Sequence, residues 1–172
     1  MKTISNKDKL SLLDKLKAKS KREANIFFSL CEKDSEIIST KKFKDVLLNS
    51  GLRAKDKRLY NLFQNLDAHG DRIVFEDFID IIRSSELIVE KALRGELSIP
   101  DFSYFAKNLN DMFDEVKKVK SGELASYIPP LANVDPDQFG VAIVTTDGQI
   151  YQKGDSEVDF SIQSMCKPFN YC

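Results

Sequence analysis

An internal repeat is the feature that most constrains how this 172-residue chain can fold. Between Ala24 and Ser84, four apolar positions recur 35 residues further on: Phe28, Ile38, Phe43 and Leu47 are followed by Phe63, Ile73, Phe78 and Ile82. Each copy shows the periodicity of a helix, a short polar loop and a second helix, with helices expected over 24–32 and 40–49, then over 57–66 and 75–83. The repeat therefore predicts two helix-loop-helix units.

The apolar residue late in each loop indicates how the two copies meet. Ile38 and Ile73 occupy equivalent places, where they can pair across the loops as a short β-bridge. Thr40 is a suitable N-cap for the helix that follows the first loop, and Gly51 a suitable stop at its end. This pattern resembles a paired EF-hand.

The ligand positions of the two loops decide whether they should hold calcium. A calcium loop needs oxygen donors at positions 1, 3 and 5, glycine at 6 and a bidentate glutamate at 12. With Ile38 at position 8, the first loop carries Lys42 at position 12, and with Ile73 at position 8 the second carries Leu66 and Ala68 at positions 1 and 3. We expect no metal in either loop. The acidic residues around the second loop, expected as caps or solvated groups, are Asp67, Asp71 and Asp77.

The charge balance leaves no general attraction to nucleic acid or an anionic membrane, because 26 basic residues face 27 acidic ones. The charge is divided along the chain, with 15 basic and 8 acidic residues in 1–57 and 11 and 19 in 58–172. No apolar run approaches the roughly 18 residues of a membrane span, and the Lys- and Ser-rich residues after Met1 lack the apolar core that we expect of a secretory signal. We expect a cytoplasmic protein without cofactor, and read residues 1–22 as a basic helical lead-in or, alternatively, a targeting presequence.

The middle of the chain predicts two more helices. The first runs from Ser85 to Leu93 and stops at Gly95; the second follows a linker that ends in a capping Asp101. Large apolar residues, expected on one core or interface face of this second helix, are Phe102, Phe105, Leu109, Met112, Phe113 and Val116.

Beyond Gly122 the pattern changes to β-structure. A strand is expected over 139–146, a two-residue turn at Asp147-Gly148, a strand over 149–152 and a third extended piece over 158–161. A loop punctuated by prolines precedes these strands, and a helix should begin at 162–164. The whole is an α+β chain.

The tetrad Ser164-Met165-Cys166-Lys167 carries the chemical signal. Residues three apart at a helix start share a face, so a neutral lysine amine could take the proton of the serine hydroxyl. An N-cap serine with a surface lysine is the plainer interpretation of the same four residues. The tetrad follows a β-hairpin, as the S-x-x-K motif of penicillin-recognising enzymes follows sheet strands.

The surrounding residues resemble a more specific family. The runs 139–149, 153–155 and 160–169, with 122–132 upstream, closely resemble the start of the catalytic domain of the serine-dependent glutaminases, which share the β-lactamase-like fold. The EF-hand-like region resembles the one that precedes this domain in kidney-type and some bacterial glutaminases. The chain is thus expected to be an amino-terminal fragment.

The resemblance implies hydrolysis of L-glutamine to L-glutamate and ammonia. It makes Ser164 the nucleophile and Lys167 its general base, and it places Tyr127 and Gln163 against the substrate. The alternative interpretations without a substrate are an ordinary helix-start residue for Gln163 and packing on the sheet for Tyr127. Because only about 50 residues of a catalytic domain are present, we expect this chain alone to be inactive.

The sequence predicts four segments: the lead-in 1–22, an EF-hand-like domain over 23–95, a linker with a long helix over 96–122, and the start of the catalytic domain over 123–172. The family resemblance implies a homo-oligomer, a dimer or tetramer, and allows a mitochondrial location. Two other functions remain open: a non-catalytic EF-hand-like assembly or regulatory module, and a penicillin-recognising serine acyl transferase.

Overall fold

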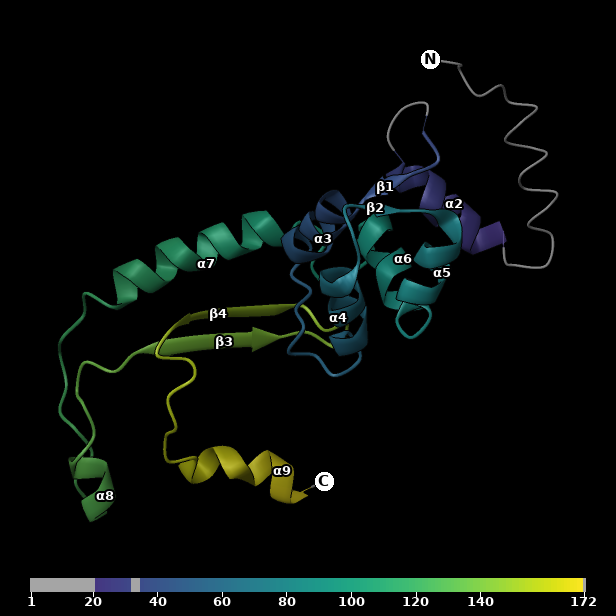
Figure 1. Ribbon diagram of the computed structural model, residues 1–172. Coiled ribbons are helices and arrows are strands. Elements are labelled where there is room, and N and C mark those ends of the chain that lie inside the picture. The colour runs from purple at the N-terminus through teal and green to yellow at the C-terminus, as the bar shows by residue number, and fades with distance from the viewer. Residues whose placement is uncertain (1–20, 32–34, 172) are drawn as a thin grey trace. The chain divides into compact units, whose positions relative to one another are not determined.

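The computed structural model describes residues 21–31 and 35–171, so most of the predicted lead-in lies outside the described residues. The chain divides into two units (Figure 1). The helical unit comprises the chain up to Phe105 together with the segment Val144–Ile150. The strand unit comprises Ala106–Ile143 and the residues from Tyr151 onward.

The helical unit contains the elements that the repeat predicts. They are α2 (Lys21–Leu30), β1 (Ile38–Ser39), α3 (Thr40–Asn49), α4 (Tyr60–Ala68), β2 (Arg72–Ile73), α5 (Phe75–Ile82) and α6 (Glu86–Arg94). The helix predicted from Lys57 begins only at Tyr60, because Asp56 first forms a turn. Its carboxylate accepts the backbone N–H of Arg58 at 2.9 Å, and its carbonyl accepts that of Leu59 at the same distance.

The two loops meet as predicted. Ile38 pairs with Ile73 in an antiparallel bridge, and both side chains are completely buried. The predicted N-cap is wrong by one residue, since the hydroxyl of Ser39 caps α3 by accepting the N–H of Lys42. Thr40 is the first helical residue, and its hydroxyl and N–H instead bond the carbonyls of Gly70 and Asp71 in the other loop. Thr40 therefore ties one loop to the other.

Aromatic rings fill the core of the helical unit. The rings of Phe27 and Phe43 each lie 5.5 Å from that of Phe78, measured between centroids. All three side chains are completely buried, whereas Phe28, which belongs to the repeat pattern, is only partly buried. Burial of an aromatic side chain of this size contributes about 1.5–3 kcal/mol. The core thus contains Phe27, the neighbour of the predicted core position Phe28.

Glycines end α3 and α6 in the way the sequence predicts. Gly51 has φ +86°, its N–H bonds the carbonyl of Leu48 at 3.0 Å, and the N–H of Leu52 bonds that of Leu47 at 3.1 Å. Gly95 has φ +68° and makes the corresponding bond to Ala92. These bonds satisfy carbonyls that would otherwise lack a partner at a helix end.

The remaining elements follow in chain order. They are α7 (Phe102–Val116), α8 (Pro129–Ala132), β3 (Gly140–Val144), β4 (Ile150–Gly154), the 3₁₀ turn η1 (Gln163–Cys166) and α9 (Lys167–Tyr171). Asp101 caps α7 as predicted, accepting the N–H of Tyr104 at 2.9 Å. On the predicted apolar face of α7, Phe102 and Phe113 are buried, but Met112 and Val116 are more than half exposed.

Three predictions about the C-terminal part need correction. Residues 158–161 form no strand, and the proline-punctuated stretch includes the short helix α8, since proline suits the first helical position. The turn between β3 and β4 has three residues, because Thr145 pairs with Gln149 and Gly148 donates to the carbonyl of Thr145. Asp147 has no positive φ, which a two-residue type I′ turn would require; only Gly148 does, at +90°.

Replacing Gly51 by alanine should destabilise the helical unit more than replacing Gly95. Both glycines have a positive φ, which costs an L-residue about 1–2 kcal/mol. A Cβ at Gly51 would also meet the ring of Phe102 at 2.7 Å, whereas the space around Gly95 is open. Urea unfolding followed by circular dichroism should therefore show the larger loss for Gly51→Ala. Equal losses would contradict a steric role for the Phe102 contact.

Candidate active site

Strand β4 is fixed to α7 inside the strand unit. The Tyr151 hydroxyl donates to Oδ1 of Asn110 at 2.9 Å, and Lys153 reaches the Asp114 carboxylate at 2.7 Å. The Lys153 ammonium also lies 4.8 Å from the ring centroid of Phe113. Burial raises the pKa of the Tyr151 phenol, so this residue is a neutral donor at physiological pH. These contacts give the hairpin a rigid base.

The start of β3 and the end of β4 are joined by a second set of contacts. The backbone N–H of Phe139 donates to the Asp155 carboxylate at 2.9 Å, and the Asp155 N–H donates to the Phe139 carbonyl at 3.0 Å. The ring of Phe139 lies 4.7 Å from that of Phe113. The chain therefore leaves β4 at a defined point before it continues to η1.

Gln163 begins η1 with an unusual backbone conformation. Its φ is +45°, and it is the one non-glycine residue of the described chain with a positive φ. Residues held in this region cost on the order of 1–3 kcal/mol and gather at functional sites. The conformation sets the direction in which the next residue, Ser164, enters the helix.

The structure brings Gln163 and Tyr127 together across 36 positions of sequence. The Tyr127 hydroxyl lies 3.2 Å from Oε1 of Gln163, and Nε2 of Gln163 donates to the Ser161 hydroxyl at 2.7 Å. Two of the four predicted site residues are thus direct neighbours. Ser161 is a further member that the sequence analysis did not identify, and no motif distinguishes it.

Ser164 and Lys167 stand one turn apart where η1 passes into α9. The Lys167 N–H donates to the Ser164 carbonyl, which confirms that a helix begins here. Both side chains are exposed, and no hydrogen bond within the described chain joins the Ser164 hydroxyl to the Lys167 amine. The two groups therefore share a helical turn without the contact that proton transfer requires.

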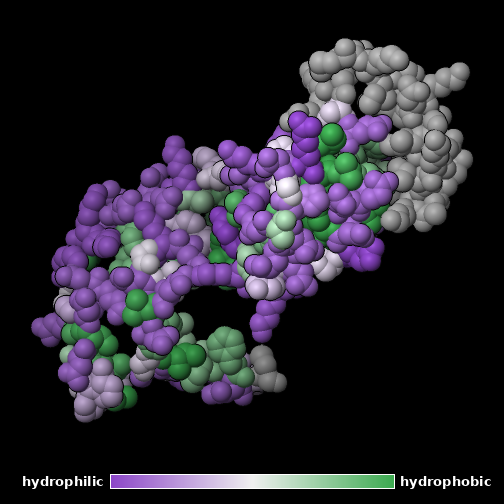
Figure 2. All heavy atoms as spheres, in the orientation of Figure 1, coloured by the Kyte–Doolittle hydropathy of each residue, from purple (hydrophilic) through white to green (hydrophobic). Residues whose placement is uncertain are grey.

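Exposed hydrophobic side chains adjoin these two residues in the sequence. Figure 2 shows them over α9, and the exposed members with more than half of their surface accessible include Met165, Phe169 and Tyr171. A hollow of about 480 Å³ in the strand unit lies elsewhere, between residues 116–124 and 136–139. None of the four predicted site residues lines it.

The described residues contain neither a cluster of metal-binding side chains nor a helix suited to crossing a membrane. In residues 21–31 and 35–171, no three His, Cys, Asp or Glu side chains come together as a metal site would require. Over the same residues, no helix combines the length and the apolar character that crossing a membrane requires.

Comparisons with known proteins agree on the class of protein. A family model described as "Glutaminase" matches residues 122–172, and one described as "EF-hand domain" matches residues 22–100. The chain is 31% identical to the "Glutaminase liver isoform, mitochondrial" of Rattus norvegicus over 152 residues, which cover 85% of the chain and 25% of that protein.

Bacterial relatives match a shorter stretch at higher identity. The "Glutaminase" of Nostoc sp. is 46% identical over 82 residues, covering 48% of this chain and 24% of that protein. "Glutaminase 2" of Bradyrhizobium diazoefficiens is 52% identical over 61 residues, which are 36% of this chain and 10% of that protein.

The fold and the matches therefore define an α+β protein with an EF-hand-like helical domain ahead of a segment that matches the glutaminase model. The chain belongs to the glutaminase family. It spans about a quarter of the length of the curated animal relatives that it matches.

Removing the Tyr151 hydroxyl should weaken the attachment of β4 to α7. Tyr151 is 6% exposed, and Tyr151→Phe would leave Oδ1 of Asn110 without its donor. The expected loss is about 1 kcal/mol in the free energy of unfolding, measured in urea. Tyr104→Phe, at a tyrosine that is 65% exposed, is the control and should change stability by less than about 0.5 kcal/mol. Equal values for the two variants would contradict an anchoring role.

Proposed function

We propose that this chain forms the nucleophile-bearing part of an enzyme that hydrolyses L-glutamine to L-glutamate and ammonia. The observation that carries the proposal is the segment 163–167, which lies within the glutaminase match and presents Ser164 directly after a positive-φ residue. The contact of Gln163 with Tyr127 supports it, because two proposed substrate-binding groups meet beside the proposed nucleophile.

The proposed chemistry uses the serine as nucleophile and the lysine as base. Oγ of Ser164 attacks the side-chain amide carbon of glutamine, and the neutral amine of Lys167 takes the hydroxyl proton. That proton passes to the departing nitrogen as the C–N bond breaks, so ammonia leaves and a glutamyl ester stays on Ser164. Water, deprotonated by the same amine, then cleaves the ester to give glutamate and restores the serine.

The remaining site groups bind and stabilise. The amide of Gln163 and the hydroxyl of Tyr127 offer donors and acceptors to the α-amino and α-carboxylate groups of glutamine. The N–H of Ser164, at the start of a helical turn, is suited to the negative oxygen that develops on the amide carbon. No cofactor enters the scheme.

The 172 residues alone should not release ammonia from glutamine. Lys167 is exposed and makes no hydrogen bond to Ser164, and the hydrophobic surface around both is open to water. A base in this state has neither the contact nor the dry surroundings that the reaction needs. A coupled glutamate dehydrogenase assay on the purified chain should show only background turnover. Turnover that Ser164→Ala abolishes would overturn this part of the proposal.

In a longer protein that contains this chain and is active, Ser164→Ala should reduce kcat on the order of 10³-fold or more. Lys167→Ala should cost about 10²–10⁴-fold, and Lys167→Arg should not restore activity, because a guanidinium does not lose its proton. Ser121→Ala, at an exposed serine outside the site, is the control and should keep full activity. Unchanged turnover in Ser164→Ala would exclude this serine as the nucleophile.

Tyr127→Phe in the same longer protein should raise KM more than it lowers kcat, since the hydroxyl is proposed to bind substrate without taking part in proton transfer.

A penicillin-recognising enzyme is the less favoured alternative, because the matched family is the glutaminases. Mass spectrometry after incubation with a β-lactam should find Ser164 unmodified; acylation by the β-lactam would revive that alternative.

We also propose a homo-oligomer, on the family resemblance, and the four-segment organisation predicted from the sequence. The location is proposed to be the cytoplasm, with the mitochondrion as the alternative because the rat relative carries "mitochondrial" in its name. Sedimentation of the full protein tests the first of these, and a mass corresponding to a monomer would contradict it.

A further inference from the structure

The segment Val144–Ile150 contains the turn between β3 and β4, and we call this whole segment the turn below. It is part of the helical unit although it begins 39 positions after Phe105. It adds a short ladder to the loop that follows α3. The N–H of Ile150 donates to the Gly51 carbonyl at 2.8 Å, and Leu52 and Gln149 form an isolated antiparallel bridge. Leu52 and Gln149 are both completely buried.

The side chain of Gln149 uses its whole amide group against the helical unit. Nε2 donates to the Ser50 carbonyl at 2.9 Å and to the Ile99 carbonyl at 2.8 Å, while Oε1 accepts the Ile99 N–H at 3.0 Å. Ser50 caps α3, so its carbonyl lies beyond the hydrogen bonds of the helix. A single buried amide therefore joins the end of α3 to the segment that precedes α7.

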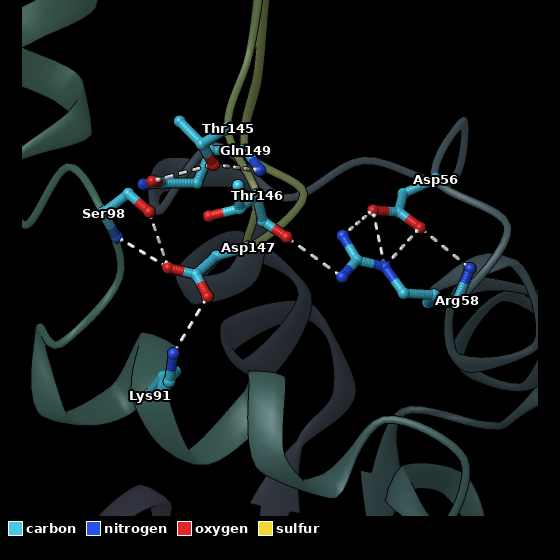
Figure 3. Close-up of polar contacts among 8 residues, drawn as sticks. All are labelled: Asp56, Arg58, Lys91, Ser98, Thr145, Thr146, Asp147 and Gln149. Carbon is cyan, nitrogen blue, oxygen red and sulfur yellow. Dashed lines mark hydrogen bonds and ion pairs between the residues drawn. The ribbon is translucent and has the colours of Figure 1, made fainter. Parts of the chain in front are cut away.

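The neighbouring Asp147 makes charged contacts with α6 and with the same segment. Its carboxylate accepts the N–H and the hydroxyl of Ser98 at 2.9 and 2.8 Å, and it pairs with Lys91 at 3.0 Å (Figure 3). The bonds from Lys91 and Ser98 lower the pKa of this carboxyl group. On the other side of the turn, Arg58 donates to the Thr146 carbonyl at 3.0 Å and is itself held by Asp56.

We propose that the turn is an integral part of the helical unit's fold, held in a site that we call the turn clamp. The clamp consists of the loop at Gly51 and Leu52, Lys91 of α6, the segment Ser98–Ile99, and Arg58. The clamp holds the turn through hydrogen bonds to the amide of Gln149 and through hydrogen bonds and an ion pair to the carboxylate of Asp147. The folding of the EF-hand-like domain and the closing of the β3–β4 hairpin are then one cooperative event.

The chemistry of the clamp explains why these two side chains are required. The side chain at position 149 faces the carbonyls of Ser50 and Ile99 and the N–H of Ile99. Only a group with two N–H donors and one acceptor can bond all three. Glutamate would place an acceptor against both carbonyls. Leucine would leave all three partly buried backbone groups without the bonds that Gln149 makes to them, at a cost in desolvation.

The full chain tests the proposal through its amide protons. Hydrogen exchange by NMR should show the Ile99 amide exchanging at least about tenfold faster in Gln149→Leu, since its acceptor is lost. The same change is expected in Gln149→Glu, since a carboxylate oxygen that faces the carbonyls of Ser50 and Ile99 repels them and opens the clamp. The amides of Leu52 and Ile150 should lose protection together with it, because the clamp opens as one unit. Gln152→Glu, at an exposed position of β4, is the matched control and should leave all three amides unchanged.

A folded Gln149→Leu protein in which Ile99, Leu52 and Ile150 keep their protection would overturn the proposal. If the Gln149 variants do not fold, Asp147→Asn provides the same comparison at a partly exposed position, and its readout is the Ser98 amide. Protection of Ser98 and Ile99 should then fall together; a loss confined to Ser98 would mean that the contacts are separate and would overturn the cooperative clamp.

The acid dependence of the clamp supplies an independent test. Because the folded pKa of Asp147 is lowered, its contribution is fully present above the unfolded pKa of about 3.9 and is lost as the pH falls through the folded value. The charged groups facing the turn are Lys91, Arg58 and Asp56, and Arg58 also lowers the pKa of Asp56.

Protection of the Ser98 amide, corrected for intrinsic exchange, should therefore decrease in the unaltered chain as the pH falls below the unfolded pKa of about 3.9 and through the lower folded pKa of Asp147. The decrease should be smaller in Asp147→Asn, where only Asp56 still titrates at the clamp. Identical pH profiles in the two proteins would exclude a role for the Asp147 charge.

Discussion

Buried backbone polar groups must be hydrogen-bonded, and much of the helical unit depends on how that requirement is met outside the helices. At the paired loops, the Ile38–Ile73 bridge and the bonds from Thr40 satisfy the backbone of both repeats. At the end of α3, glycine geometry satisfies the carbonyls of Leu47 and Leu48, and the amide of Gln149 satisfies that of Ser50. The first two solutions lie within the repeats, but Gln149 lies about 65 positions beyond them, so the repeats alone do not complete the fold.

The sequence predicted what repeats or follows local rules. The pairing of Ile38 with Ile73, the bounds of α3 and the glycine stops are all present, because apolar spacing and capping chemistry act over a few residues. The errors arise where distant partners decide. Thr40 resembles a cap, yet its hydroxyl is taken by the carbonyl of Gly70, and residues 158–161 have strand-like composition without a strand.

The candidate site shows the same division. Ser164 and Lys167 are candidates because of their spacing and the family resemblance, and Tyr127 and Gln163 because of the resemblance alone. The positive φ of Gln163 had no sequence signal, since glutamine does not favour that conformation, and Ser161 has no motif of its own. The contribution of the hairpin turn to the helical unit was also not predicted, because Gln149 has the sequence context of an ordinary strand residue. Its role depends on hydrogen bonds to Ser50 and Ile99, which are distant in the sequence.

The helical unit is discontinuous in sequence, and this has a consequence for the order in which a ribosome delivers it. Residues up to Phe105 leave the exit tunnel first, yet Gln149 must follow before the carbonyls of Ser50 and Ile99 find their partner. At synthesis rates of about 5–20 residues per second, the nascent domain waits a few seconds in an incomplete state. During that interval the carbonyls of Ser50 and Ile99 can only be hydrogen-bonded by water, because their partner in the folded chain has not yet been made.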